Sequence, residues 1–151
     1  MNQVTDQQII EILRKEAVPA LGCTEPVACA LACAKCKEVL GGVPERLDVL
    51  VSGNIYKNGM GVGIPGTGMV GLPIAAALGA VCGKSEYGLE VLKEVNVGDN
   101  LQRAKDMLDQ VTVSLKEDVP DKLYAEALAT KGNDTVKVVI AHTHTNIVLV
   151  E

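Results

Sequence analysis

The sequence predicts an α+β fold, with Ala- and Gly-rich helices first and an antiparallel sheet in the C-terminal third. Two observations predict it. Helix start and stop residues punctuate the first two thirds of the chain, and β-rich runs with a Gly-Asn-Asp turn fill the last third. The length of 151 residues suits one compact domain. Because the sequence has no Phe and no Trp, the core must be packed from aliphatic side chains.

Capping residues place the first helices. Thr5 and Gln8 form a capping-box pattern that opens a helix ending before Pro19. A second helix should begin after Thr24 and run to Leu40, where consecutive glycines stop it.

Residues 47–52 read as a strand. The glycine-dense segment 53–71 is one that no ordinary helix would tolerate. Pro73 opens an Ala-rich helix that ends near Gly83, and residues 89–95 and 100–108 predict two more helices. The β-rich runs are 111–116, 123–130 and 136–150, with a hairpin turn at 132–134.

Composition excludes several classes of protein. The net charge of −5, without a Lys/Arg cluster or aromatic platforms, argues against nucleic-acid binding. No apolar stretch reaches the roughly 20 residues that cross a membrane. Since the polar start also lacks a signal-peptide pattern, we expect a cytoplasmic protein. The five cysteines then indicate reduced thiols or a metal site rather than disulfides.

Cys23 directly precedes the predicted second helix. The positive end of a helix stabilises a thiolate, which makes this cysteine a candidate base, nucleophile or metal ligand. A small buried residue in a tight turn is an equally good interpretation.

Cys29, Cys33 and Cys36 have the C-x3-C-x2-C spacing of the radical-SAM cluster motif. On a helix, however, they form one stripe, whereas cluster ligands need a loop that wraps the iron. Buried cysteine behaves as a small hydrophobe, so we interpret the stripe as core and assign no metal ligands in this chain.

The glycine-dense segment contains a G-x-G-x-x-G string at Gly66, Gly68 and Gly71. A dinucleotide site would need a preceding strand and a well-placed acidic residue, and a P-loop would need Gly-Lys-Ser/Thr, so neither is favoured. Glycines and a helix start suit a carboxylate-binding loop instead. The candidate substrate-binding residues of this segment are Asn54, Lys57, Asn58, Gly66, Thr67 and Gly68. Lys57 as a pyridoxal phosphate lysine has no support.

Near the C-terminus, His142, His144 and Asn146 would share one face of a strand. Two histidines at this spacing can serve a metal, hydrogen-bond a substrate or lie at a subunit contact, and all three options stay open. Among these we count His144 as a candidate substrate-binding residue.

Three segments carry a family resemblance: PALGCTEPVA (19–28), NIYKNGMGVGIPGTGMVGLPIAAALGA (54–80) and HTNI (144–147). They resemble the L-cysteine desulfidase family and the related iron–sulfur L-serine dehydratases. The resemblance extends along the whole chain but reaches only about the first third of a typical member.

The resemblance implies a pyridoxal-independent lyase of amino-acid catabolism that holds a four-iron cluster ([4Fe–4S]) through three cysteines. It also implies that the cysteine of the CTEP block is the base, which is Cys23 here, and that the glycine-rich block holds the substrate carboxylate. The products would be pyruvate and ammonia, with sulfide when cysteine is the substrate. Cys29, Cys33, Cys36 and Cys82 do not match the family's cluster positions.

We therefore expect residues 1–151 to be the amino-terminal domain of a longer enzyme. This domain supplies the base and the carboxylate loop but not the cluster ligands, and is inactive alone. Its partners would be a small amino acid and the remainder of its own chain, with a homo-oligomer left open. A small-anion-binding module or a non-catalytic assembly domain is the alternative, and the choice between cysteine and serine is open.

Overall fold

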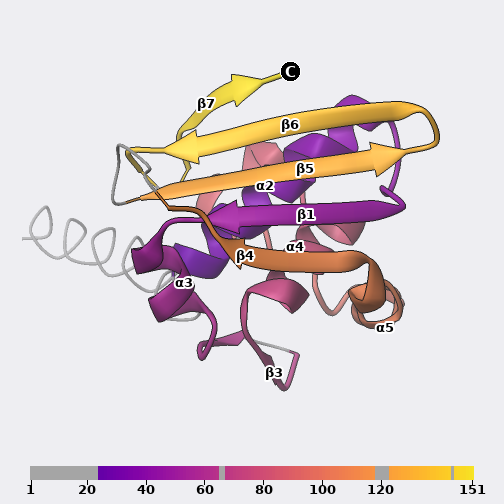
Figure 1. Ribbon diagram of the computed structural model, residues 1–151. Helices are drawn as coiled ribbons and strands as arrows, with labels where there is room; N and C mark the ends of the chain where they lie inside the picture. The colour runs from indigo at the N-terminus through magenta and orange to yellow at the C-terminus, as the bar shows by residue number, and fades with distance from the viewer. Residues whose placement is uncertain (1–23, 65–66, 118–122, 144) are drawn as a thin grey trace, which may run out of the picture.

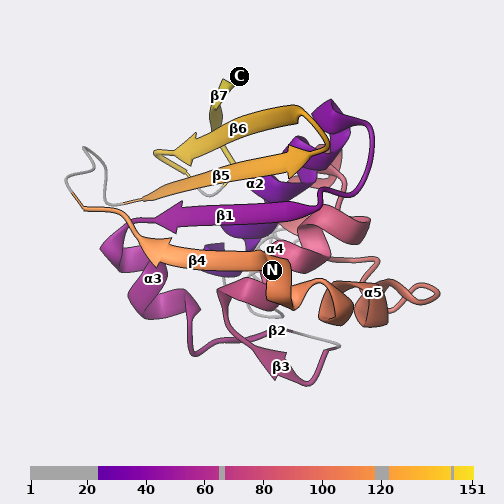
Figure 2. The ribbon, with the colours of Figure 1, turned by 45° about the vertical axis from the view of Figure 1, so that its right-hand side comes forward.

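The computed structural model describes residues 24–64, 67–117, 123–143 and 145–151. Within them, helices cover one face of a five-stranded sheet and leave the other face open (Figures 1 and 2). The predicted helix between Thr5 and Pro19 lies outside the described residues. The α+β class is confirmed.

Helix α2 (Thr24–Leu40) ends where its sequence predicts, with Gly41 in the left-handed region after it, and Glu25 lies in its first turn; the residues before Thr24 lie outside the described part of the chain. It is buried over most of its length because it lies between the sheet and the other helices. Its C-terminal turn is tied to the next helical layer by Lys37, whose Nζ donates to the carbonyl oxygen of Gly83 at 2.6 Å.

The sheet has the order β4-β1-β5-β6-β7. Its strands are β1 (Arg46–Val51), β4 (Val111–Leu115), β5 (Tyr124–Lys131), β6 (Asp134–Ala141) and β7 (Ile147–Val150). Strands β1, β5, β6 and β7 pair antiparallel, and the predicted hairpin joins β5 to β6 through a left-handed Gly132. Strand β4 instead pairs parallel with β1, which makes the sheet mixed.

Helix α4 (Leu72–Cys82), also predicted, lies against α2 in a close parallel crossing. An added Cβ at Gly79 would overlap the backbone of Ala30, and one at Gly83 would stand 3.1 Å from the Cβ of Ala34. The two helices can approach this closely only because small residues line both of them. The core is aliphatic, as its composition predicts.

Two predictions about the middle of the chain are wrong. Residues Gly53–Gly59 form a short helix, α3, whose two glycines stand at its ends; Gly59 packs against Leu72, where an added Cβ would overlap the leucine. The predicted helix over 89–95 is instead the end of a 3₁₀ segment, η1 (Ser85–Glu90), followed by turns. The predicted helix at 100–108 is confirmed as α5 (Asn100–Asp106), followed by η2 (Leu108–Gln110).

None of the helices in the described part of the chain combines the length and the apolar character that a membrane crossing requires.

Candidate functional site

One end of the sheet collects most of the segments singled out from the sequence. Strands β1 and β4 end there, and β5, which is antiparallel to β1, begins there. Helix α2 runs in the same direction as β5, since Cys36 lies against Ala127 and Gly42 lies against Lys131. The amino end of α2 therefore lies at the same end of the molecule as α3 and the start of β5 (Figures 1 and 2).

Ser52 joins this end of the sheet to α3. It is buried at the end of β1, its N–H donates to the carbonyl of Tyr124 at 2.9 Å, and its Oγ accepts the Tyr124 N–H at 3.2 Å. Its own carbonyl accepts the N–H of Tyr56 in the first turn of α3. The only sequence signal for this role is a serine between a strand and a Gly-Asn pair.

Helix α3 presents three of the predicted binding residues. Asn54, Lys57 and Asn58 are all exposed, and their spacing of three and four places them on one helical face. Ile55 and Gly59 face the core instead. The three side chains thus offer two amide groups and one ammonium group to solvent.

The rest of the glycine-dense segment is a small hairpin, β2 (Gly63–Ile64) and β3 (Met69–Val70), that leads into α4. Thr67 is buried, and its Oγ1 donates to the carbonyl of Ile64 at 2.6 Å and accepts the Met69 N–H at 2.9 Å. Its hydroxyl therefore holds the hairpin turn rather than facing solvent. Gly68 is exposed with φ +68°, a conformation that suits glycine, and Gly66 lies outside the described residues.

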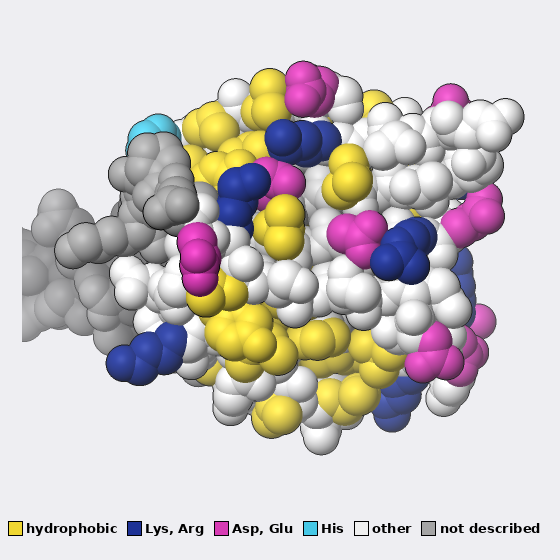
Figure 3. Space-filling model, in the orientation of Figure 1, with side chains coloured by type: hydrophobic (Ala, Val, Ile, Leu, Met, Phe, Trp, Pro, Cys, Tyr) yellow, Lys and Arg dark blue, Asp and Glu magenta, His cyan; other side chains and the backbone are white. Residues whose placement is uncertain are grey.

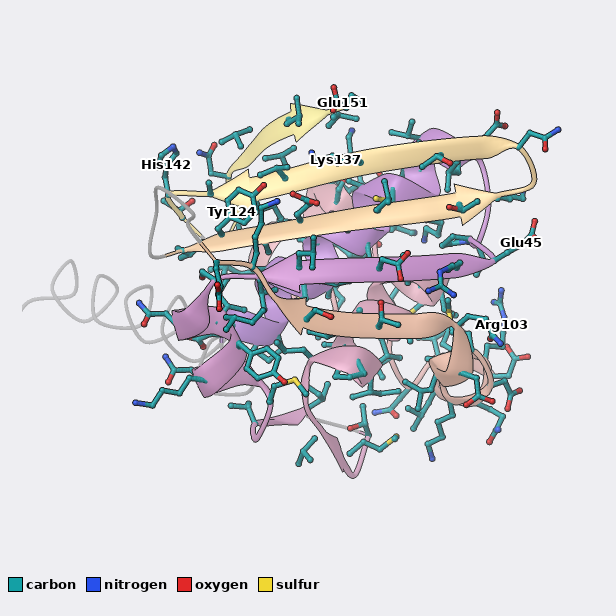
Figure 4. All side chains as sticks on the ribbon, in the orientation of Figure 1. Glu45, Arg103, Tyr124, Lys137, His142 and Glu151 are labelled. Carbon is teal, nitrogen blue, oxygen red and sulfur yellow. The ribbon has the colours of Figure 1, made fainter. Side chains whose placement is uncertain are left out.

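The prediction of a strand face bearing His142 and Asn146 is wrong, because β6 ends at Ala141. His142 has φ +76°, and its N–H donates to the carbonyl of Leu123 at 3.4 Å. The side-chain amide of Asn146 donates to the carbonyl of Ala141 at 3.1 Å and holds the turn into β7. His142 is exposed beside the start of β5, and Figure 4 shows it at the same end as Tyr124.

Sequence reasoning missed a polar cluster on the open face, which we name the Glu126 cluster. Its members are Lys116, Tyr124, Glu126 and Lys137 (Tyr124 and Lys137 are labelled in Figure 4). Oε1 of Glu126 accepts the Tyr124 hydroxyl at 2.8 Å and lies 3.2 Å from Nζ of Lys116 and 3.8 Å from Nζ of Lys137. Tyr124 and Glu126 lie on β5, Lys137 lies on β6, and Lys116 directly follows β4, so only the folding of the sheet brings the four residues together.

The contacts within the Glu126 cluster shift the pKa values of Glu126 and Tyr124. Burial alone would raise the pKa of Glu126, but the hydrogen bonds from Tyr124 and Lys116 and the charges of Lys116 and Lys137 outweigh it, so the net pKa is lowered. Burial, helped by the hydrogen bond to Glu126 and its charge, raises the pKa of Tyr124 to about 12. Glu126 is therefore a carboxylate, and Tyr124 a neutral donor, at neutral pH.

The cysteine stripe is core, as interpreted from its spacing. Cys29, Cys33 and Cys36 are fully buried, and burial raises the pKa of both Cys29 and Cys36 to about 12. Cys36 and Cys82 donate to the main-chain carbonyls of Ala127 and Leu78 respectively. These four thiols do not fit an iron–sulfur cluster, which needs convergent thiolates.

Within the described ranges, no three His, Cys, Asp or Glu side chains are grouped to hold a metal ion. Two residues central to the predicted site, Cys23 and His144, lie outside those ranges. The structure thus brings the ends of β1 and β6 and the start of β5 to the same end of the molecule as α3 and the start of α2. Cys23 and His144 are not among the residues that it describes.

Relatives of known name match the whole chain. It is 54% identical, over its full length, to a UPF0597 protein of Parabacteroides distasonis, of which it covers 35%. Over 94% of its length it is 54% identical to a UPF0597 protein of Aeromonas hydrophila, of which it covers 32%. The chain resembles UPF0597 proteins.

A UPF0597 protein of Phocaeicola vulgatus is 52% identical over 95% of the chain. The chain thus spans about a third of the length of the curated relatives it matches. No protein-family model matches it, and no solved structure matches it.

These matches correct the family drawn from the sequence motifs. The relatives bear the name UPF0597 protein, so the assignment to the L-cysteine desulfidase and iron–sulfur L-serine dehydratase family is wrong. What holds from that expectation is its coarser part, since a chain that spans a third of its relatives corresponds to a portion of a larger protein.

Proposed function

We propose that this chain is the substrate-holding part of a larger cytoplasmic enzyme that performs α,β-elimination on L-cysteine or L-serine without pyridoxal phosphate. One observation carries the proposal: the amino end of α2, the exposed face of α3 and the turn after β6 meet at one end of the sheet. These are the segments whose residue types suit an amino-acid substrate.

The substrate carboxylate would lie between α3 and the start of α2. Lys57 offers a positive charge, and Asn54 and Asn58 offer amide donors on the same face. The first N–H groups of α2 are the positive end of a helix and favour an anion. Thr67 and Gly68 would act indirectly in this arrangement by fixing the hairpin that precedes α4.

The base would be Cys23, which immediately precedes the first residue of α2 in the sequence. Its thiolate would take the Cα proton, and the electron pair left at Cα would form the Cα–Cβ double bond as the Cβ–S or Cβ–O bond breaks. The aminoacrylate product tautomerises and hydrolyses to pyruvate and ammonia. We assign help to the leaving group, and the ligands of the expected four-iron cluster, to the rest of the protein.

The test is turnover by the full-length protein that carries this chain, purified without oxygen. We expect pyruvate from L-cysteine or L-serine, with kcat reduced at least about 100-fold in Cys23→Ala because a general base is lost. Lys57→Ala should instead raise KM about tenfold while kcat changes less. Lys131→Ala, at the far end of the sheet, is the matched control and should keep both constants within twofold.

Full turnover in Cys23→Ala would remove this residue from the mechanism. An unchanged KM in Lys57→Ala would move the carboxylate away from α3. Binding of the amino acid without any product would favour the alternative, a small-anion-binding module.

A further inference from the structure

The described residues leave one side of the sheet uncovered at β7. We infer that this edge of the sheet, which we name the β7 surface, is where the rest of the full-length protein packs, adding a strand to the edge of β7 and covering the apolar side chains beside it. The β7 surface consists of Leu128 and Leu149, which lie on the open face, and of Val148 and Val150 of the same edge strand. Val150 pairs with Val138 and therefore lies on the opposite face of the sheet.

The β7 surface is apolar and accessible. Leu128, Leu149, Val150 and Val148 are 36%, 37%, 41% and 47% exposed. Leu149 pairs with Val139, and Val139 pairs with Glu126, two residues from Leu128, so Leu128 and Leu149 share the open face. Figure 3 views this face and shows hydrophobic side chains over β6 and β7, beside basic and acidic ones.

Strand β7 is an edge with main-chain groups left for a partner. Lys137 and Glu151 exchange both hydrogen bonds, each at 2.9 Å. In an antiparallel ladder, hydrogen-bonded and non-hydrogen-bonded pairs alternate, so the adjacent pair, Val138 and Val150, is not hydrogen-bonded. The main-chain groups of each of these two residues point away from the other strand. The N–H and carbonyl of Val150 therefore face outward, which suits pairing with an added strand.

Charge indicates what lies beside that strand. The Glu126 cluster adjoins the β7 surface and holds two ammonium groups against one carboxylate, with the two lysine side chains 37% and 34% exposed. An apolar segment with an acidic residue would complement it. A second copy of this chain would instead oppose two clusters of the same net charge.

Length decides the occupant. The relatives have about twice as much additional chain as the part that this chain matches, since it covers 32 to 35% of them. A unit that leaves an apolar edge and one face of its sheet open would be expected to aggregate if nothing covered it. The remaining two thirds of the protein belongs to the same polypeptide, so it is always available to cover this edge.

Hydrogen–deuterium exchange tests the inference. The 151-residue chain and the full-length protein that carries it are compared under the same conditions. We expect the Val150 amide to exchange at least tenfold more slowly in the full-length protein. Strand β4, the opposite edge of the sheet, is the internal control and should exchange equally in both. Equal exchange of β7 in the two proteins would overturn the inference.

Substitution gives a second reading. In the full-length protein, Leu149→Glu should restore fast exchange at β7 and lower the midpoint of thermal unfolding, while the 151-residue chain keeps its own midpoint. Val97→Glu, 59% exposed elsewhere on the chain, is the matched control and should change neither. Concentration-dependent protection of β7 in the isolated chain would identify a second copy as the occupant and overturn the proposal. Neither measurement depends on activity, so its failure leaves the proposed elimination untouched.

Discussion

At the scale of single residues, Glu126 is the most constrained charge in the described part of the chain. It is only 7% exposed, although it lies on the face of the sheet that the described helices leave uncovered. Tyr124 and two lysines compensate the cost of burying its charge, and all three converge on the same carboxylate oxygen. The strand register that assembles them is absent from the local sequence, so this cluster could not be predicted.

Glu126→Gln should lower the free energy of unfolding at pH 7 by about 1–2 kcal/mol, because it removes the negative charge that the two lysines share. The folded-state pKa of Glu126 is lowered, so its charge stabilises the fold above the unfolded pKa of about 4.3 and ceases to do so as pH falls through the folded pKa. Denaturant unfolding at several pH values checks this.

The difference in the free energy of unfolding between wild type and Glu126→Gln should become smaller in acid. Glu90→Gln, at an exposed position, should change stability by less than about 0.5 kcal/mol at every pH. A difference that stayed constant down to low pH would show that the charge of Glu126 does not stabilise the fold.

At the scale of elements, capping and turn residues predicted several of the helix ends and the hairpin turn. Gly41 follows the end of α2, Pro73 opens α4, and the Gly-Asn-Asp turn joins β5 to β6, because caps and turns depend on neighbouring residues only. Helix α3 was missed because the segment around it is rich in glycine, although the two glycines of α3 itself stand at its ends. The parallel pairing of β1 with β4 joins segments more than 60 residues apart and leaves no local signal.

The candidate site shows the same division. The candidate binding residues of α3 were chosen by residue type, and they share a face once the helix exists. The hydrogen bonds by which Ser52 and Thr67 hold this end of the sheet and the small hairpin were not predicted, because each depends on a main-chain group brought close by folding.

Gly79→Ala tests the contact between α2 and α4. Alanine is the better helix former by about 1 kcal/mol, yet its methyl group would overlap the main chain of Ala30, so we expect a net destabilisation of about 1–3 kcal/mol or more. Gly63→Ala is the control, since a Cβ there meets nothing within 4 Å, and thermal unfolding compares the two. A rise in the unfolding midpoint of Gly79→Ala would mean that the helices lie farther apart.

At the scale of the whole molecule, the described part of the chain is a sheet with helices on one side and none on the other. The chain corresponds to about a third of its relatives, and the proposed chemistry needs groups from the other two thirds. Because the cluster ligands are assigned to the rest of the protein, the short chain and the full-length protein should differ in iron binding.

The 151-residue chain, incubated anaerobically with iron and sulfide, should develop no cluster absorbance, because its described thiols are buried and protonated in the core. The full-length protein treated in the same way should develop it. A stable cluster on the short chain would show that the helical cysteines can leave the core, or that Cys23 recruits iron by itself.

The main-chain contact between Ala30 and Gly79 has one more consequence. Two rods that touch without intervening side chains have no compliant layer between them, so they cannot slide or roll independently. A shift of α4 is therefore expected to carry α2 with it. A segment that displaced the small hairpin, which leads into α4, would therefore be expected to move α2 as well.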